Sequence, residues 1–336
     1  MKTNDHLPME PYAPHSDRYN ESFYRTCGMS GIQLPKLTLG LWHNFGDADN
    51  LHEGRNMLRR AFDLGINHFD LANNYGPPYG SAEQNFGTIF KQDFEAYRHE
   101  LFIATKAGYD MWPGPFGRGG CKKYLINSLD LSLKRMQLDY VDLFYHHTPD
   151  PSTPVEETAD ALALMHQQGK ALYIGISNYY TPEIANPMVK ALNDRGVPLF
   201  INQLRYNPLD RKAEALFPIC EKEGFGVIAF SPLAQGVLSG KYKKGIPENS
   251  RAANSASYLA NGLEKSFIEK AIQLEELASE AGLTLIELTF LWILRNKAVA
   301  SVLAGASNVK QIEQNVEALE KPPLDEEVIR QLDQII

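Results

Sequence analysis

Residues 139–147 read Asp-Tyr-Val-Asp-Leu-Phe-Tyr-His-His, and this stretch contains the unit from which the chain is built. A nearly continuous apolar run ends in polar residues, as expected of a strand that is buried on both faces and then enters a loop. Amphipathic helix patterns flank the run at 124–136 and 156–168. The stretch therefore predicts a β/α unit, in which helices connect parallel strands.

Apolar runs of the same kind recur along the chain. Together with 141–145, the expected strands are 37–42, 67–71, 101–105, 172–176, 199–202, 227–230 and 301–304. Helical periodicity also covers 265–280, 285–295 and 309–319. Eight β/α units in 336 residues favour a single closed (β/α)8 TIM barrel. An open Rossmann sheet is disfavoured, because residues 40–43 read Gly-Leu-Trp-His where a G-x-G-x-x-G motif would be needed.

The N-terminal region differs from the rest of the chain. Residues 1–22 are polar and contain three prolines, which predicts an extended arm. Two short β-compatible runs between 24 and 34 surround Gly28-Met29-Ser30-Gly31, which predicts a β-hairpin. No change in composition marks a linker further on. We therefore expect an arm over 1–22 and one barrel domain over 23–336.

Composition excludes several classes of protein. The net charge of −8 disfavours binding to nucleic acid, which requires a basic surface. The three cysteines lie far apart in the sequence, so we expect reduced thiols and neither disulfides nor a metal site. The start of the chain has no apolar segment typical of a signal peptide, and no run approaches the ~20 apolar residues of a membrane span. These features predict a cytoplasmic globular protein.

Polar residues end six successive predicted strands, and in a barrel these ends share one rim, where active sites lie. Alone, each has an ordinary structural explanation: a lysine at the surface, or a histidine with a structural hydrogen bond. Together they predict a site at the barrel mouth, formed by Asp70, Lys106, His147, Ser177, Asn178, Gln203 and Ser231.

Tyr75 lies on the loop that follows Asp70 and completes a chemically sensible group. Tyrosine is a poor acid at neutral pH, but a neighbouring lysine lowers its pKa, and a carboxylate keeps that lysine charged and in position. We therefore expect Tyr75 to have a lowered pKa and to protonate a carbonyl oxygen while a hydride reaches the carbonyl carbon.

The sequence resembles the aldo-keto reductase family from residue 24 to the C-terminal end. The motifs that carry the resemblance are 65–76 (Gly-Ile-Asn-His-Phe-Asp-Leu-Ala-Asn-Asn-Tyr-Gly), 103–106, 139–147, 175–179 and 231–236. Segments 240–242, 245–247, 250–251 and 305–308 are similar to the branch that holds potassium-channel β-subunits and bacterial glyceraldehyde-3-phosphate reductases. The resemblance implies a catalytic tetrad of Asp70, Tyr75, Lys106 and His147. His147 is preferred to His146, which the alternation of a strand would direct to the opposite face.

The resemblance also implies NADP(H) as the cofactor, bound across the barrel mouth without a Rossmann domain. Ser177, Asn178 and Gln203 would hold the nicotinamide amide, and Phe230 would stack on its ring. Better-known relatives carry a Lys-Ser pair and a later Arg for the 2′-phosphate where this chain reads Ala306-Ser307-Asn308, so preference for NADP would depend on Lys241 and Arg251. The complete cofactor-binding set is Trp42, Asp70, Ser177, Asn178, Gln203, Phe230, Ser231, Pro232, Leu233, Gln235, Gly236, Lys241, Arg251, Gly305, Ser307, Gln311 and Asn315.

These residues imply NADP(H)-dependent reduction of a small polar aldehyde such as methylglyoxal, glyceraldehyde or glyceraldehyde 3-phosphate. The alternative is a cofactor-binding regulatory subunit with little turnover, like the potassium-channel β-subunits, which carry asparagine where this chain has His147. A metal-dependent lyase would need several carboxylates at the mouth, and the sequence places only Asp70 there. Relatives in this branch suggest a homo-oligomer, a tetramer or larger.

Overall fold

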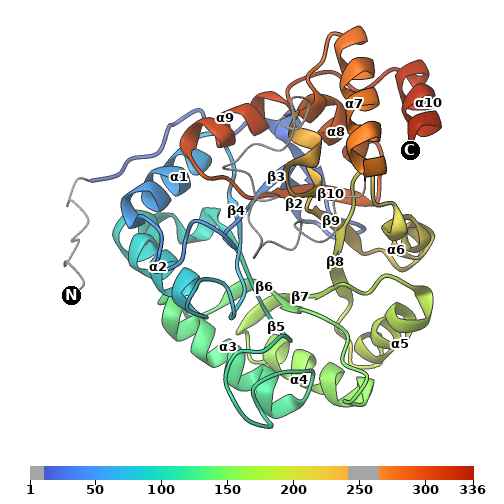
Figure 1. Cartoon of the computed structure of the whole chain (residues 1–336). Coiled ribbons are helices and arrows are strands. Elements are labelled where there is room, and N and C mark those ends of the chain that lie inside the picture. The colour runs from blue at the N-terminus through green and yellow to red at the C-terminus, as the bar shows by residue number, and fades with distance from the viewer. Residues whose placement is uncertain (1–10, 241–264) are drawn as a thin grey trace.

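A computed structural model describes residues 11–240 and 265–336 and contains the predicted closed barrel (Figure 1). Eight parallel strands follow one another around the barrel in chain order, and the last strand closes it by pairing with both the first and the seventh. The strands are β3 (Leu37–Gly40), β4 (His68–Asp70), β5 (Phe102–Ala107), β6 (Val141–His146), β7 (Ala171–Ser177), β8 (Leu199–Arg205), β9 (Gly226–Phe230) and β10 (Val299–Ala304).

Helices surround the barrel on its outside (Figure 1). They are α1 (Leu51–Asp63), α2 (Ser81–Ile89), α3 (Lys122–Met136), α4 (Val155–Gln167), α5 (Pro182–Asn193), α6 (Phe217–Glu223), α7 (Lys265–Glu280), α8 (Leu285–Leu294), α9 (Val309–Glu317) and α10 (Glu326–Ile335). Shorter helical turns are η1 (Glu21–Phe23), η2 (Phe90–Phe94), η3 (Glu95–Glu100), η4 (Lys212–Leu216) and η5 (Ala234–Ser239). Among the described residues no single helix is long and apolar enough to cross a bilayer, and only α7 and α8, bent by 93° against each other, meet that criterion as a pair.

The predicted hairpin is confirmed and closes one end of the barrel. Its strands β1 (Tyr24–Thr26) and β2 (Gln33–Pro35) are antiparallel. Cys27 and Leu34 are fully buried in one cluster with side chains of the barrel interior, including Phe200 and Ile228. The hairpin therefore leaves open the opposite end of the barrel, where the strands terminate and where the sequence predicts the site.

The described part of the N-terminal arm packs against the barrel helices. The Tyr12 hydroxyl lies 2.8 Å from Asp63 Oδ1 at the end of α1. The hydroxyl of Tyr19 donates to Glu100 of η3 at 2.5 Å, and Arg18 forms an ion pair with the same carboxylate. Residues 11–20 have no strand or helix, residues 21 and 22 of the predicted arm belong to η1, and these contacts attach residues 11–20 to the barrel.

A buried charge cluster joins α1 to η2. Arg55 Nε donates to Asp93 Oδ2 at 2.7 Å, and Arg59 Nη2 donates to Asp93 Oδ1 at 2.8 Å. The Asp93 side chain is fully buried, and burial alone would raise its pKa. The two guanidinium groups outweigh burial and hold the pKa of Asp93 below its usual range, so the carboxylate stays charged.

We expect Asp93→Asn to lower the free energy of unfolding by about 3 kcal/mol, because the substitution leaves buried cationic charge without its counterion. Chemical denaturation monitored by circular dichroism measures this difference. Asp139→Asn, at an exposed carboxylate, is the matched control and should change stability by about 0.5 kcal/mol or less. Equal effects of the two substitutions would contradict the role assigned to Asp93.

Candidate active site

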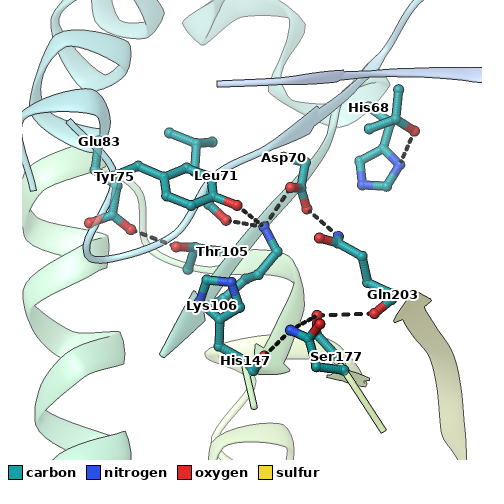
Figure 2. Close-up of polar contacts among 12 residues, drawn as sticks. His68, Asp70, Leu71, Tyr75, Glu83, Thr105, Lys106, His147, Ser177 and Gln203 are labelled. Atoms are coloured by element: carbon teal, nitrogen blue, oxygen red, sulfur yellow. Dashed lines mark hydrogen bonds and ion pairs between the residues drawn. The ribbon is translucent and has the colours of Figure 1, made fainter. Parts of the chain in front are cut away.

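Lys106 is the centre of a hydrogen-bonded group at the C-terminal end of the barrel (Figure 2). Its Nζ donates to Asp70 Oδ2 at 2.5 Å, to the Leu71 carbonyl at 2.7 Å and to the Tyr75 hydroxyl at 3.2 Å. Asp70 ends β4 and pairs with Ala104 of β5, so Lys106, two residues further along, points to the same face. The pairing of neighbouring strands thus brings together the acid, the lysine and the loop tyrosine predicted from the sequence.

Burial and the neighbouring charges set the protonation states of this group. Burial favours a neutral Lys106, but the Asp70 carboxylate outweighs it and raises the pKa of Lys106 above its ordinary value. Burial raises the pKa of Tyr75, and although Lys106 acts in the opposite direction, burial prevails. The predicted lowering of the Tyr75 pKa is therefore wrong as a net effect. At neutral pH Lys106 is a cation and Tyr75 retains its proton.

His147 lies against Tyr75, as predicted, and His146 does not. The rings of Tyr75 and His147 are 6.1 Å apart and nearly perpendicular. His146 Nδ1 instead lies 2.7 Å from the Tyr179 hydroxyl, so the two histidines do point to different faces. Burial, followed by the repulsion of Lys106, lowers the pKa of His147 well below its ordinary value. The imidazole of His147 is therefore neutral.

The residues predicted to hold a nicotinamide amide are connected to this group. Gln203 Nε2 donates to Asp70 Oδ1 at 3.0 Å, and the Ser177 hydroxyl donates to the Gln203 carbonyl at 3.0 Å (Figure 2). Asn178 Nδ2 donates to the carbonyl of His147 at 3.0 Å. One continuous network of side chains and carbonyls therefore spans β4, β6, β7 and β8 at the barrel mouth.

The segment after β9 begins at the same rim. Phe230 ends β9, and the guanidinium carbon of Arg205 lies 5.7 Å from the centroid of its ring. Positive φ angles at Ser231 (51°) and Gln235 (56°) turn the backbone tightly, a conformation that few L-residues adopt. The predicted residues Pro232, Leu233 and Gly236 lie in this turn, at 231–236. Lys241 and Arg251 lie outside the described residues.

The remaining predicted residues lie near the ends of β10 and β3. Gly305 and Ser307 follow β10, and the backbone N–H of Ser307 donates to Gln311 Oε1 at 2.9 Å, at the start of α9. Asn315, further along α9, is buried. Trp42 is 51% exposed after β3, and its ring lies 6.2 Å from that of Tyr75. These groups therefore extend the site along one side of the mouth.

Sequence reasoning missed several residues of the mouth. Tyr109 lies beside His147, with ring centroids 4.6 Å apart, and is 42% exposed. Tyr180 donates from its hydroxyl to Asn178 Oδ1 at 3.3 Å. The sequence could have pointed to these two tyrosines only through their positions, because Tyr109 shortly follows Lys106 and Tyr180 shortly follows Asn178. Within the described ranges, no three His, Cys, Asp or Glu side chains are placed to hold a metal ion.

We expect Tyr75 to ionise only above pH 10.0, the ordinary value for tyrosine, because burial outweighs the attraction of Lys106. The measurement is a titration of phenolate absorbance, taken as the difference between the wild-type protein and Tyr75→Phe. A midpoint clearly below 10 for Tyr75 would show that Lys106 prevails over burial.

Comparisons with known proteins identify the family of the chain. Residues 36–336 match the model of the aldo/keto reductase family. The chain is 51% identical over 326 residues to L-glyceraldehyde 3-phosphate reductase of Escherichia coli K12, covering 95% of this chain and 94% of the relative. It is 36% identical over 308 residues to a probable voltage-gated potassium channel subunit beta of Arabidopsis thaliana, covering 90% and 92% of the two chains.

Solved structures give the same result. The holo form of an aldo-keto reductase from Bacillus halodurans superposes with a TM-score of 0.76 at 26% identity, covering 93% of this chain and 95% of that one. A thermostable aldo-keto reductase solved with the inhibitor epalrestat gives a TM-score of 0.73 at 29% identity, with 93% and 99% coverage. The family match and the fold agree, and the chain belongs to the aldo/keto reductase family of oxidoreductases.

Proposed function

We propose that this oxidoreductase reduces small polar aldehydes to alcohols with NADPH, and that Tyr75 supplies the proton. The observation that carries the proposal is the position of Lys106 Nζ, which is hydrogen-bonded to both Asp70 and the Tyr75 hydroxyl in a buried group. The similarity to L-glyceraldehyde 3-phosphate reductase supports an aldehyde substrate. Methylglyoxal, glyceraldehyde and glyceraldehyde 3-phosphate are the candidates.

The protonation states of the site suit this reaction. Tyr75 retains the proton that the carbonyl oxygen needs, and Lys106 stabilises the phenolate that remains after proton transfer. Asp70 and the Leu71 carbonyl prevent Lys106 from moving. Neutral His147 carries one N–H, which can donate to the same carbonyl oxygen and orient it beside Tyr75. When bound, reduced nicotinamide supplies the hydride.

The residues at the mouth fit such a cofactor by their chemistry. Ser177, Asn178 and Gln203 offer the donors and acceptors that a primary amide requires, and all three belong to the network around Asp70 and His147. Phe230 provides an aromatic face at the end of β9. Phosphate groups of the cofactor would bind at two places: the backbone of 231–236, and the start of α9 with Ser307 and Gln311. Backbone N–H groups at a helix N-terminus bind anions such as phosphate.

A regulatory subunit with little turnover is the second candidate, since the chain is also similar to a potassium channel subunit beta. The residues favour the enzyme, because all four tetrad positions are filled and His147 packs against Tyr75.

We also propose, from the resemblance alone, a cytoplasmic homo-oligomer of four or more copies. Light scattering after gel filtration measures this assembly.

Tyr75→Phe should lower kcat for aldehyde reduction by at least about 100-fold, because it removes the proton donor. NADPH affinity, measured by fluorescence titration, should change little, since the phenylalanine ring keeps the packing beside Trp42 and His147. Turnover near that of the wild type would remove Tyr75 from the mechanism. A wild-type protein that binds NADPH but oxidises none of it with any aldehyde of a panel would favour the regulatory candidate.

Preference for NADPH is proposed to depend on Lys241 and Arg251. Their joint replacement by alanine should weaken NADPH binding by tenfold or more and leave NADH binding nearly unchanged, because only NADPH has a 2′-phosphate. A charge-assisted hydrogen bond contributes roughly 1.5–3 kcal/mol, which corresponds to about tenfold or more in affinity. Fluorescence titration with both cofactors is the measurement. Equal losses would assign the two cations to the pyrophosphate.

A further inference from the structure

Tyr109 borders the site on the side of His147 and has no part in the mechanism above. Its ring contacts that of His147 edge to face, with centroids 4.6 Å apart. The side chain is 42% exposed, while His147 beneath it is only 7% exposed. Trp42 has the matching position beside Tyr75, so two half-exposed aromatic rings flank the pair that would hold the carbonyl oxygen.

The backbone of Tyr109 is held in place by the same residues that hold Lys106. The Asn73 N–H donates to the Lys106 carbonyl at 2.9 Å, and the Asn73 side chain donates to the Tyr124 hydroxyl at 3.0 Å. Tyr124 in turn donates to the carbonyl of Tyr109 at 2.6 Å. At Gly108 an added Cβ would lie 3.1 Å from Cβ of His147, so glycine permits the close approach of this segment. The position of Tyr109 is therefore fixed relative to the tetrad.

The Tyr109 hydroxyl contacts Asn178, a residue of the predicted nicotinamide site. Asn178 Nδ2 donates to its oxygen at 3.4 Å, and this contact does not use the phenolic proton. For a substrate whose carbonyl oxygen lies between Tyr75 and His147, Trp42 and Tyr109 are the exposed aromatic residues that flank this pair, and of the two only Tyr109 carries a hydroxyl. An oxygen on the carbon next to the carbonyl group can accept the phenolic proton, whereas an unsubstituted carbon cannot.

We propose that Tyr109 determines specificity for aldehydes that carry an oxygen on the carbon next to the carbonyl group, namely 2-hydroxy and 2-oxo aldehydes. This inference rests on the proposed reductase function and names the residue that would recognise the oxygen shared by its candidate substrates. Glyceraldehyde and methylglyoxal both carry such an oxygen, and propanal has the same chain length without it. Because the bond is made to the bound substrate as well as to the transition state, its loss should raise KM more than it lowers kcat.

The test compares methylglyoxal, which differs from propanal only by the oxygen on the second carbon, with propanal in the wild type and in Tyr109→Phe, which keeps the ring against His147 and removes only the hydroxyl. For methylglyoxal, kcat/KM should fall roughly three- to tenfold, as expected for one neutral hydrogen bond. For propanal it should stay within about twofold. Tyr173→Phe makes the same chemical change against Phe102 and Phe200 at the other end of the barrel, and should affect neither substrate.

Equal losses with both aldehydes would overturn the inference, because they would mean that the Tyr109 hydroxyl acts through His147 and not on the substrate. Unchanged kinetics with methylglyoxal would overturn it as well. Both outcomes leave the reductase function intact, since the wild type reduces the aldehydes in either case. A wild type that reduces no aldehyde overturns the proposed function itself, and this inference with it.

Discussion

Asp70 and Lys106 hold opposite charges inside the barrel, where neither side chain is exposed. Their ion pair, at 2.5 Å, constrains the positions of the residues that contact it. A charge buried without its partner would cost several kcal/mol, so each polar atom of the pair needs a fixed neighbour. Gln203 of β8 supplies one for Asp70, and the Leu71 carbonyl and Tyr75 hydroxyl supply two for Lys106. The pair thereby fixes the relative positions of β4, β5, β8 and the loop that carries Tyr75.

The barrel interior below the pair keeps water away from it. Leu143, Ile201 and Ile228 belong to a fully buried cluster, and the hairpin adds Cys27 and Leu34 to the same cluster from the opposite end. Some polar side chains inside the barrel pair with one another, as Thr38 does with His68 and Ser301 at 3.0 and 2.8 Å. Burial lowers the pKa of His68 to about 3, so this set adds no charge. Lys106 and Asp70 consequently interact in a medium of low polarity, where their attraction is strong.

Local patterns predicted most of this fold, because a strand buried on both faces is apolar throughout and a strand end is polar. Such runs located all eight strands within a few residues, and the polar ends located Asp70, Lys106 and His147. The same patterns could not give the sign of the Tyr75 pKa shift, which depends on a balance between burial and one nearby cation. Tyr109 was missed for a related reason. Its contact with His147 joins two loops that are distant in the sequence, and no periodicity encodes such a contact.

The distribution of donors and acceptors explains why this mouth suits a carbonyl oxygen. Asp70 is the one carboxylate of the tetrad, and both of its oxygens are occupied, one by Lys106 and the other by Gln203. Its side chain is also fully buried, which keeps it away from a substrate at the mouth. Tyr75 is protonated and His147 is neutral with one N–H, so both can donate a hydrogen bond to a substrate oxygen, while the Lys106 cation lies directly behind Tyr75. An oxygen atom that gains negative charge during a reaction is stabilised by such donors and by the nearby cation.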